Sequence, residues 1–400
     1  MCKMFCRLLS ALVVILSVSP FGAEAQTLSG RIMLNDSVPA AFATVFVSTT
    51  GQGTIADNEG NYMLEALPSG DHEVEFSYIG FRTEQQSVGI SGTEDEVLDV
   101  MLNEQPLNLS EVFVTPTGED PAVYILRKVS EQAAINRKRL KAYDASVVHA
   151  FHAQDVDFVP AILPSAFEWV IKATMKTMRM GEIYELCTRN ERVDVRMSVT
   201  NHFASGKTKY LDEHVVSSSP ALTAKAEQQL FRICQSDLFD QLYGKDMLYF
   251  RDLKKGGKGE FAYKLKGTIE EQGRTIDVLE HISKRDSLTI TSTVYVVEDN
   301  WGILRSELHF MDGSLFRTEC RDIGGGIFMP VIEVSDPHVV TIDAGMIQEE
   351  KEKMEASGEK MGRMERKMFE RMERILATRG SLQPCMTFGY NIQYRNVVIE

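Results

Sequence analysis

The sequence lacks the short motifs that mark most recognisable enzymes and nucleic-acid-binding proteins. Its 400 residues include 6 Cys and 2 Trp, with no C-x-x-C pair, no H-E-x-x-H and no G-x-S-x-G. Lys and Arg number 43 against 57 acidic residues, so the net charge is −14. Phosphate backbones are bound by clustered Lys and Arg, so we expect no nucleic-acid partner.

The sequence also lacks an apolar run long enough to span a bilayer. Its longest apolar stretch, Leu8 to Val18, is too short and follows Lys3 and Arg7. Small residues two apart, Ala23 and Ala25, come next. This pattern predicts a secretory signal peptide over 1–25, cut after Ala25, and fits a buried N-terminal helix poorly. We therefore expect export to the periplasm or the outer membrane, with no transmembrane helix after cleavage.

Positive charge is scarce in the first part of the mature chain. Residues 26–103 hold two Arg, no Lys and twelve acidic residues, a net charge of −10. The signal peptide contains two cations and one anion, so the mature chain carries −15 and residues 104–400 carry −5. Repulsion between like charges should keep the segment 26–103 away from anionic lipid.

Few cysteines remain for cross-linking after signal removal. Cys187, Cys234, Cys320 and Cys385 are dozens of residues apart and allow three disulfide pairings. Isolated buried thiols fit equally well, because a chain of this length can fold without disulfides.

Residues 26–103 show the pattern of short strands separated by turns. The stretches "FATVFVS", "NYMLEAL" and "HEVEFSYIG" are typical of strands, and no helical period competes with them. In the last of these, one face carries Val74, Phe76 and Tyr78, and the other, expected to be wet, carries Glu73, Glu75 and Ser77. The pattern predicts a seven-strand-type β-sandwich.

The stretch "GTIADNEGNYMLEALPSG" raises the question of a metal loop. A calcium loop needs oxygen ligands at positions 1, 3 and 5 and Gly at position 6, whereas Gly60 is at position 4 when Asp57 is counted as position 1. Asp can bond the following backbone, and Gly accepts a positive φ without steric cost. We therefore interpret Asp57, Gly60, Gly70 and Gly80 as structural turn residues.

The same residues resemble the carboxypeptidase-regulatory-like domain, a transthyretin-like sandwich. Mild departures are Ile32, Ala56 and a shortened loop at 38–41. The resemblance implies a sandwich without catalytic residues. The residues that match the family pattern are Gly30, Ala43 to Val47, Gly53, Thr54, Asp57, Gly60, Tyr62, Leu67, Pro68, Gly70, Gly80 and Phe81.

Residues 104–142 read as a linker followed by a helix. Asp120 and Pro121 suit a helix start, and the buried face is expected to be formed by Ala122, Ile125, Leu126, Val129 and Ala133. The stretches "LNLSEVFVTP" and "GEDPAVYILRKVSEQ" resemble exported proteins of Bacteroidota in which a domain of unknown function follows the sandwich. TonB-dependent receptors share the first half of this arrangement, but we do not transfer transport by their barrels to this chain.

Residues 143–345 are expected to form an antiparallel α+β module with a curved, half-barrel-like sheet. Hairpin turns are predicted at Gly273, Asp299-Asn300 and Asp312-Gly313, and a helical segment over 222–243. The run 261–310 resembles lipoprotein-carrier folds in its strand pattern. The expected strands are 143–153, 181–188, 191–199, 261–269, 274–284, 288–299 and 302–310.

Residues 346–400 contain a Met-rich, charged helix whose firm part is expected from Arg363. Its stripe comprises Met354, Met361, Met364, Met368, Met372 and Leu376. Residues 349–374 hold eight acids and eight bases, and a neutral helix lacks the basic face of a membrane-surface helix. Packing on the chain's own sheet is the favoured interpretation, with a partner groove or a membrane as alternatives.

The remaining candidates for chemistry are weak. On strands, His72 and Glu75, like His149 and His152 near Asp155, face opposite sides and cannot share one ion. Gly206-Lys207-Thr208 lacks the first Gly of a phosphate loop, since Asn201 stands there. We therefore assign no catalytic, cofactor-binding or metal residues.

These patterns favour an exported, non-enzymatic binding or adaptor protein with an envelope protein as its partner. An alternative is a lipid or lipoprotein carrier that uses the curved sheet as an apolar cup. A third is an envelope hydrolase without a recognisable motif. A carrier would need a dry wall, and "LTITSTVYVV" with apolar residues on both faces gives that idea partial support.

Overall fold

The computed structural model describes most of the chain. The described residues are 26–35, 38–57, 59–78, 80–91, 95–107, 115–116, 118–158, 180–245, 247–253, 260–285, 288–310, 314–336, 341–356 and 362–400. The predicted signal peptide with Ala23 and Ala25, the turn at Asp312-Gly313 and residue 361 lie outside these ranges. The chain divides into two compact units. The first unit consists of the residues up to Thr50 together with Thr54–Asn103, and the second consists of Gly51–Gly53 together with Glu104–Glu400.

The first unit is built from two β-sheets that share one apolar core, and most of its strand pairs are antiparallel. One sheet contains β1 (Gln26–Leu34), β2 (Val38–Pro39), β5 (Asn61–Leu67), β8 (Glu96–Val97) and β9 (Val100–Leu102), with β8 and β9 parallel to β1. The other has the order β4 (Gln52–Ile55), β3 (Thr44–Val47), β6 (Gly70–Ser77), β7 (Glu84–Ile90). The predicted β-sandwich is confirmed, with nine strands described instead of seven because β2 and β8 are two-residue strands.

Both sheets contribute to the core of this unit. Leu28, Leu64 and Phe76 are among its buried members, and Tyr62 meets the Phe76 ring edge-on with centroids 5.4 Å apart. Packing of alternate side chains from two facing sheets is what the period of two in the sequence predicted.

The expectation of a wet face on β6 is wrong for two of its residues. Glu75 is 7% exposed and Ser77 is 2% exposed. Their polar atoms are satisfied by neighbouring strands: the Glu75 carboxylate accepts from Ser48 Oγ at 3.3 Å and Gln85 Nε2 at 3.2 Å, and the Ser77 and Thr44 hydroxyls are bonded to each other. Hydrogen bonding removes most of the cost of burying such groups.

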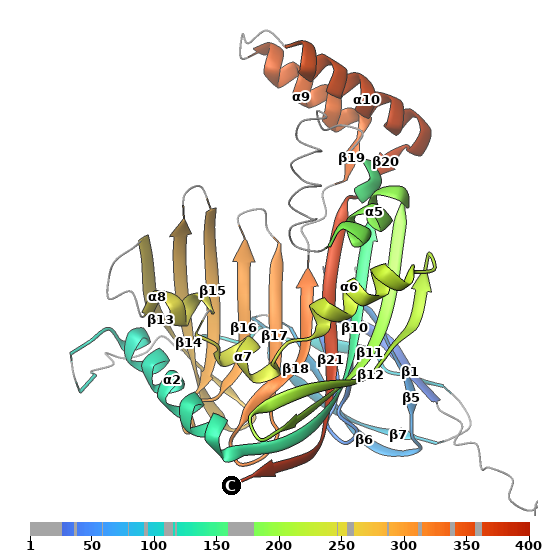
Figure 1. Ribbon diagram of the computed structural model, residues 1–400. Helices are drawn as coiled ribbons and strands as arrows, with labels where there is room; N and C mark the ends of the chain where they lie inside the picture. Colours follow the sequence, from blue (N-terminus) through green and yellow to red (C-terminus); the bar gives the residue numbers. More distant parts are fainter. Residues whose placement is uncertain are drawn as a thin grey trace, which may run out of the picture. The chain divides into compact units, whose positions relative to one another are not determined.

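The second unit is organised around an open, curved ten-stranded antiparallel sheet (Figure 1). This confirms the antiparallel, half-barrel-like sheet expected from the consecutive hairpins. The strand order is β12 (Lys207–Ser219), β11 (Arg192–Ala204), β10 (Leu140–Gln154), β21 (Cys385–Ile399), β18 (Phe328–Asp336), β17 (Leu315–Asp322), β16 (Ile303–Phe310), β15 (Leu288–Val297), β14 (Arg274–Arg285), β13 (Glu260–Glu271).

The C-terminal strand lies inside this sheet. Residues of β21 pair with β10 over its whole length, from Leu140 opposite Ile399 to Gln154 opposite Cys385, and with β18 through Glu333 opposite Tyr390. The strand therefore joins the half of the sheet formed by β10 to β12 to the half formed by β13 to β18.

The helix after the linker matches the prediction. α2 spans Pro121–Arg139, and the Asp120 side chain caps it by accepting from Ala122 N at 2.9 Å. All five residues predicted for the buried face are buried. β10 then begins at Leu140, three residues before the predicted strand.

One predicted strand is a helix. The stretch "GEIYELCT" forms α5 (Gly181–Arg189), in which Ile183, Tyr184 and Cys187 are buried. Eight residues hold too few turns for periodicity alone to separate a strand from a short helix, and packing against the next helix decides the outcome. That helix is α6 (Ala224–Cys234), and α7 (Leu238–Tyr243) and α8 (Leu248–Leu253) follow it; together α6 and α7 confirm the helical segment predicted over 222–243.

All these helices cover one face of the sheet, called here the helical face (Figure 1). α5 and α6 share a core with Val195 and Met197 of β11, and α2, α7 and α8 share a core with Leu279 and Val294. Leu279 and Val294 of one core and Met197 of the other lie on one face because one unbroken row of strand partners connects them. The row is Leu279, Val294, Ser306, Thr318, Glu333, Tyr390, His149 and Met197.

The Met-rich segment forms a helical hairpin, not a helix on the sheet. β19 (Ile342–Asp343) and β20 (Ser381–Leu382) pair at its base, and α9 (Ala344–Ala356) lies beside α10 (Arg363–Arg379). The start at Arg363 is as predicted, but packing on the chain's own sheet is wrong. The stripe packs on α9, in a separate core with buried Ile347, Phe369, Leu376 and Leu382 and partly buried Met354, Met368 and Met372.

Candidate functional site

The acidic turn of the first unit uses its oxygens for its own backbone. Asp57 Oδ1 accepts from Glu59 N at 3.0 Å and from Asn61 N at 2.8 Å. Gly60 has a φ of +80°, and a Cβ placed there would lie 2.5 Å from Ile32 O. Gly70 and Gly80 also have positive φ, at +137° and +76°, with open space around them.

The histidines singled out from the sequence have separate surroundings. His72 contacts Thr49 Oγ1 at 2.8 Å and Pro68 O at 2.7 Å through its two ring nitrogens. His149 is buried beside the rings of Phe388 and Tyr390, and burial lowers its pKa to about 4.

His152, Asp155 and Lys207 are also far from forming a metal or phosphate site. His152 Nδ1 lies 2.8 Å from Asp194 Oδ1, and Asp155 contacts Arg379. Lys207 starts β12 after a tight turn at Ser205 and Gly206, both with positive φ. Among the residues that the structure describes, no group of three or more His, Cys, Asp and Glu side chains is placed to hold a metal ion.

Cys187, Cys234, Cys320 and Cys385 are free thiols in the structure. Burial raises the pKa of Cys187 to about 11 and that of Cys234 to about 12. A thiol with a raised pKa is a poor nucleophile, so these residues behave as small core side chains.

A buried group that the sequence did not reveal combines Asp252, His281 and Ser283. Asp252 Oδ2 accepts from Ser283 Oγ at 2.7 Å and lies 3.2 Å from His281 Nε2. The Ser and His side chains both turn toward the carboxylate, whereas a nucleophile needs its base within hydrogen-bond reach. The arrangement fixes α8 to β14, and its members come from separate elements, so no spacing in the sequence could show it.

A second group missed from the sequence is a network of buried charges on the face of the sheet opposite the helices. Arg305 lies 2.9 Å from Glu319 and 3.5 Å from Glu271, and its guanidinium is over the Tyr295 ring at 5.0 Å. Burial alone would raise the pKa of Glu319, but Arg305 and two further arginines hold it below the usual value. The alternation of charged and apolar residues in β16 and β17 would have been read as a wet face.

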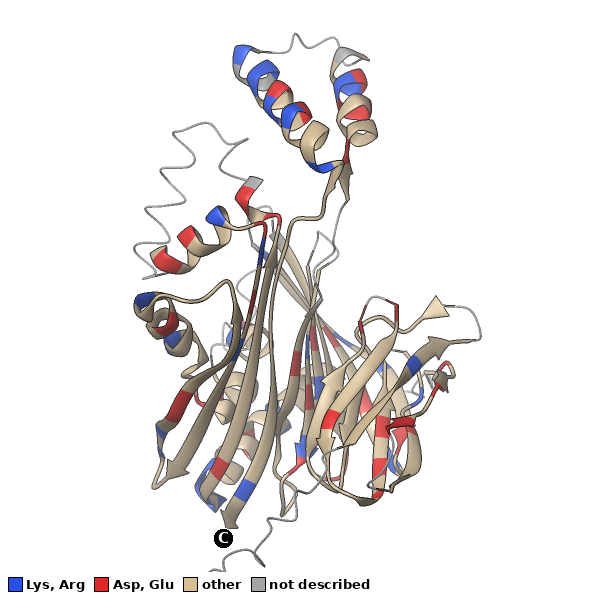
Figure 2. Ribbon diagram, turned by 90° about the vertical axis from the view of Figure 1, so that its right-hand side faces the viewer, with Lys and Arg blue, Asp and Glu red and all other residues tan. Residues whose placement is uncertain are grey.

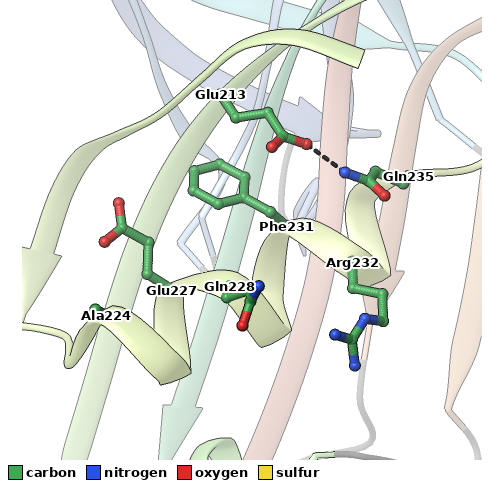
Figure 3. Close-up of a pocket in the computed structure, with 7 residues that line it drawn as sticks. All are labelled: Glu213, Ala224, Glu227, Gln228, Phe231, Arg232 and Gln235. Atoms are coloured by element: carbon green, nitrogen blue, oxygen red, sulfur yellow. Dashed lines mark hydrogen bonds between the residues drawn. The ribbon is translucent and has the colours of Figure 1, made fainter. Parts of the chain in front are cut away.

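A pocket of about 380 Å³ lies between α6 and β12 (Figure 3). Glu213 of β12 accepts a hydrogen bond from Gln235, and the Phe231 ring lies between Glu213 and Glu227. The remaining lining residues are Ala224, Gln228 and Arg232. The lining residues include no Ser, Cys or His, so the pocket offers carboxylates, amides and the Arg232 guanidinium for polar contacts without a nucleophile.

The helical face has an exposed apolar area at the end where β16 finishes and β17 begins, which we call the open patch. It comprises Ile290, Leu308, Phe310 and Phe316: Ile290 is opposite Phe310, and Leu308 is opposite Phe316. Phe316 is 37% exposed, and its ring meets that of Phe310 at 5.7 Å. Ile290, Leu308 and Phe310 are half-buried around it, and apolar side chains that stay accessible side by side are typical of interaction surfaces.

The strand β21 continues this apolar character at the same end of the sheet. Met386 is 46% exposed and Phe388 is half-buried, and both share the face of Tyr390 because they are two and four residues before it. Glu333, opposite Tyr390, accepts from Thr318 Oγ1 at 3.5 Å, and burial raises its pKa to about 7. This part of the face thus holds apolar side chains around one carboxyl group that is partly protonated near neutral pH.

Together these features define a two-module protein, a β-sandwich followed by an open sheet with a partly uncovered apolar face. Residues 28–114 match the model of the CarboxypepD_reg-like domain, which confirms the resemblance of the first module. The chain is also 27% identical over 113 residues to TonB-dependent receptor P39 of Formosa agariphila. That match covers 28% of this chain and 10% of the receptor.

Two solved structures align with most of the chain. A LolA superfamily protein from Nitrosomonas europaea is 12% identical, with 70% of this chain and 93% of that one covered and a TM-score of 0.24. A DUF1329 family protein from Desulfovibrio piger is 9% identical, with 70% and 94% covered and a TM-score of 0.25. Likenesses at these TM-scores carry no argument about function. No described helix is long and apolar enough to cross a membrane.

Proposed function

We propose that this protein is a non-enzymatic binding or adaptor protein of the cell envelope, and that its open patch is the surface that receives a protein partner. The observation that carries the proposal is the exposure of Phe316 and Met386 on the helical face. Elsewhere on that face, the chain's own helices cover apolar side chains such as Val294 and Met197. An uncovered apolar area of a sheet that is otherwise covered is the kind of surface that partners bury.

The chemistry of the described residues supports a binding role over catalysis. The titratable groups considered above are engaged in structural contacts: Asp252 with Ser283, Arg305 with Glu319, and Asp57 with its own turn. A hydrolase would need a nucleophile or activated water beside a base of suitable pKa. Glu333, with its pKa near neutrality, faces Thr318 and Tyr390 in the row of strand partners.

The envelope location rests on the first module and on the N-terminal sequence. Residues 28–114 match the CarboxypepD_reg-like domain, 113 residues of the chain match a TonB-dependent receptor, and residues 1–25 have the pattern of a secretory signal. In this proposal the sandwich is a rigid docking module. Asp57, Gly60, Gly70 and Gly80 serve only its turns.

A second candidate, a carrier of a lipid or an acylated chain, is favoured by the composition of the open patch. Ile290, Leu308, Phe310 and Phe316 supply apolar surface without a charged side chain among them. Against it, α2, α7 and α8 fill the helical face over β13 to β16 with buried side chains such as Ile125 and Tyr249. The area left for an acyl chain is therefore short.

The experiment is isolation of the native protein from envelope extracts, followed by mass spectrometry of the proteins and lipids that it retains. We expect a defined protein that is lost from Phe316→Ser/Met386→Gln, since both side chains are exposed and their replacement should leave folding intact. The matched control, Leu211→Ser/Val216→Ser, changes two exposed apolar residues on β12, which are 46% and 53% exposed. A retained lipid that is lost in the same variant would favour the carrier, and equal retention by all three proteins would contradict both roles.

A further inference from the structure

The two helices of the hairpin carry opposite charge. α9 contains four acidic and two basic residues, and α10 contains three acidic and six basic residues. Figure 2 shows the described charged residues along both helices in red and blue. Their net charges are therefore −2 and +3, in a chain whose total is −14. The equal numbers of acidic and basic residues over 349–374 arise only because the charges of both helices are added together. The argument against a membrane-surface helix, which rested on that count, therefore does not apply to α10.

Four of the six basic residues of α10 form one stripe. Arg363, Lys367, Arg371 and Arg374 are spaced by four, four and three residues, so they lie above one another on the helix surface, and all four are exposed. On the α9 side, Lys351 Nζ lies 2.5 Å from Glu373 Oε1, so one of the three acidic residues of α10 is already neutralised.

An apolar band runs directly beside this stripe. Met368, Met372 and Ile375 each follow a residue of the basic stripe, and each is half-buried. Phe369 and Leu376, on the next part of the helix surface, are 4% exposed and form the contact with α9. Around its circumference α10 therefore has a buried band, a half-exposed apolar band and a basic stripe, in that order.

We propose that α10 binds an anionic lipid surface, with the basic stripe at the headgroups and Met368, Met372 and Ile375 at the boundary with the acyl chains. Interfacial helices combine a basic polar face with an adjoining apolar face in this way. An acidic protein would complement the basic stripe but would leave the exposed parts of Met368, Met372 and Ile375, whose other parts pack against the hairpin core, in water.

The charge of the rest of the chain does not cancel this attraction. Interactions between exposed charges fall off within about 8 Å at physiological ionic strength. A surface in contact with the basic stripe is therefore attracted by the stripe, and acidic residues farther away on the chain are screened. The pairing of β19 and β20 closes the base of the hairpin, and Arg379 contacts Asp155 and Asp157 where β10 of the large sheet ends. The proposal concerns a second contact of the protein and does not depend on the partner of the open patch.

The test is flotation of the full-length purified protein with vesicles of phosphatidylcholine alone or mixed with phosphatidylglycerol. We expect binding to the mixed vesicles, weakened by salt, and little binding to neutral ones. Each Lys or Arg near an anionic surface contributes about fivefold to partitioning, so Arg363→Gln/Lys367→Gln/Arg374→Gln should bind on the order of 100-fold more weakly. Glutamine has a good helix propensity, and the replaced side chains are exposed, so the fold should be kept.

A matched control removes three exposed charges from other places in the same unit. Lys207→Gln/Lys209→Gln/Lys264→Gln changes the net charge equally and should bind as the unaltered protein does. As a second measurement, Trp placed at position 372 by Met372→Trp should shift its emission to the blue on mixed vesicles.

Three results would overturn the proposal. They are the absence of vesicle binding, equal binding to neutral vesicles, and an equal loss in the control variant. Salt-sensitive binding of α10 to an acidic protein, without vesicle binding, would assign the stripe to a protein partner instead.

Discussion

The turn at Gly60 gives the sharpest stability prediction, because two separate effects act there. A residue with a Cβ at φ +80° pays about 1–2 kcal/mol for the left-handed conformation. In addition, the Cβ would lie 2.5 Å from Ile32 O and 3.2 Å from Ala40 N. Ile32 and Ala40 are joined to this turn by hydrogen bonds, Ile32 N to Gly60 O at 2.8 Å and Ala40 N to Ile32 O at 2.9 Å.

Relieving that clash requires these two hydrogen bonds to stretch, at about 1 kcal/mol each. Gly60→Ala should therefore destabilise the 26–103 module by about 3–4 kcal/mol. For a module of this size, that lowers the melting temperature by roughly 12–32 °C. Gly80 is the matched control, because its φ is +76° and a Cβ there would have open space. Gly80→Ala should cost about 1–2 kcal/mol, from the backbone conformation alone.

The assay is thermal and urea unfolding of the isolated 26–103 module and its variants, monitored by circular dichroism. Asn separates the two effects, since it tolerates positive φ but still carries a Cβ. Gly80→Asn should be nearly neutral and Gly60→Asn clearly destabilising. Equal stabilities of these two variants would show that the clash with Ile32 O does not operate. Calcium or zinc should leave the melting temperatures unchanged, since the Asp57 carboxylate is already bonded to its own turn.

Three further predictions concern other parts of the chain. Burial raises the pKa of Glu333 from 4.5 to about 7, so the folded protein holds a proton that the unfolded chain releases between these values. Stability should therefore fall as pH rises through this window, by up to about 3 kcal/mol, and Glu333→Gln should remove that part of the change in urea unfolding; an unaltered profile would contradict the burial of this carboxyl group. Replacing residues 341–382 with a short Gly-Ser linker should leave the sheet cooperatively folded, because the hairpin has its own core, and should lower its stability through loss of Arg379, whose partners Asp155 and Asp157 are largely buried; aggregation or a molten sheet would show that the hairpin core is not separate. Protein made in its own cells should begin at Gln26, and a bulky replacement of Ala25 should leave the precursor uncut; Met1 retained on the unaltered protein would contradict export.

The parts of the fold that depend on local sequence could be predicted. Strand alternation identified β5 and β6, and Asp120 followed by Pro121 identified the start of α2, because periodicity and capping act over a few residues. The prediction of a strand at 181–188 was wrong. A pattern of eight residues does not distinguish a half-buried strand from a short helix, and the packing partner of this helix, α6, is distant in sequence.

Long-range pairing could not be predicted in the same way. Nothing in the composition of 385–399 indicates that this segment pairs with β10 and β18 inside the sheet, since the register depends on strands 50 or more residues away. The same limit applies to the sites. Phe316 and Met386 are ordinary apolar residues in sequence, and their exposure depends on where the helices stop covering the sheet. The sequence did not show where one helix ends and the next begins. The opposite net charges of α9 and α10 can be counted only once the bounds of the two helices are known.

Site-specific photocrosslinking in the living envelope tests the central claim most directly. A benzophenone side chain in place of Phe316, which is 37% exposed, would sample what covers the open patch, and one in place of Leu211, which is 46% exposed on β12, would serve as the control. A binding role for the open patch predicts one discrete protein adduct from position 316 that position 211 does not give. The same adducts from both positions, or none from position 316, would contradict it.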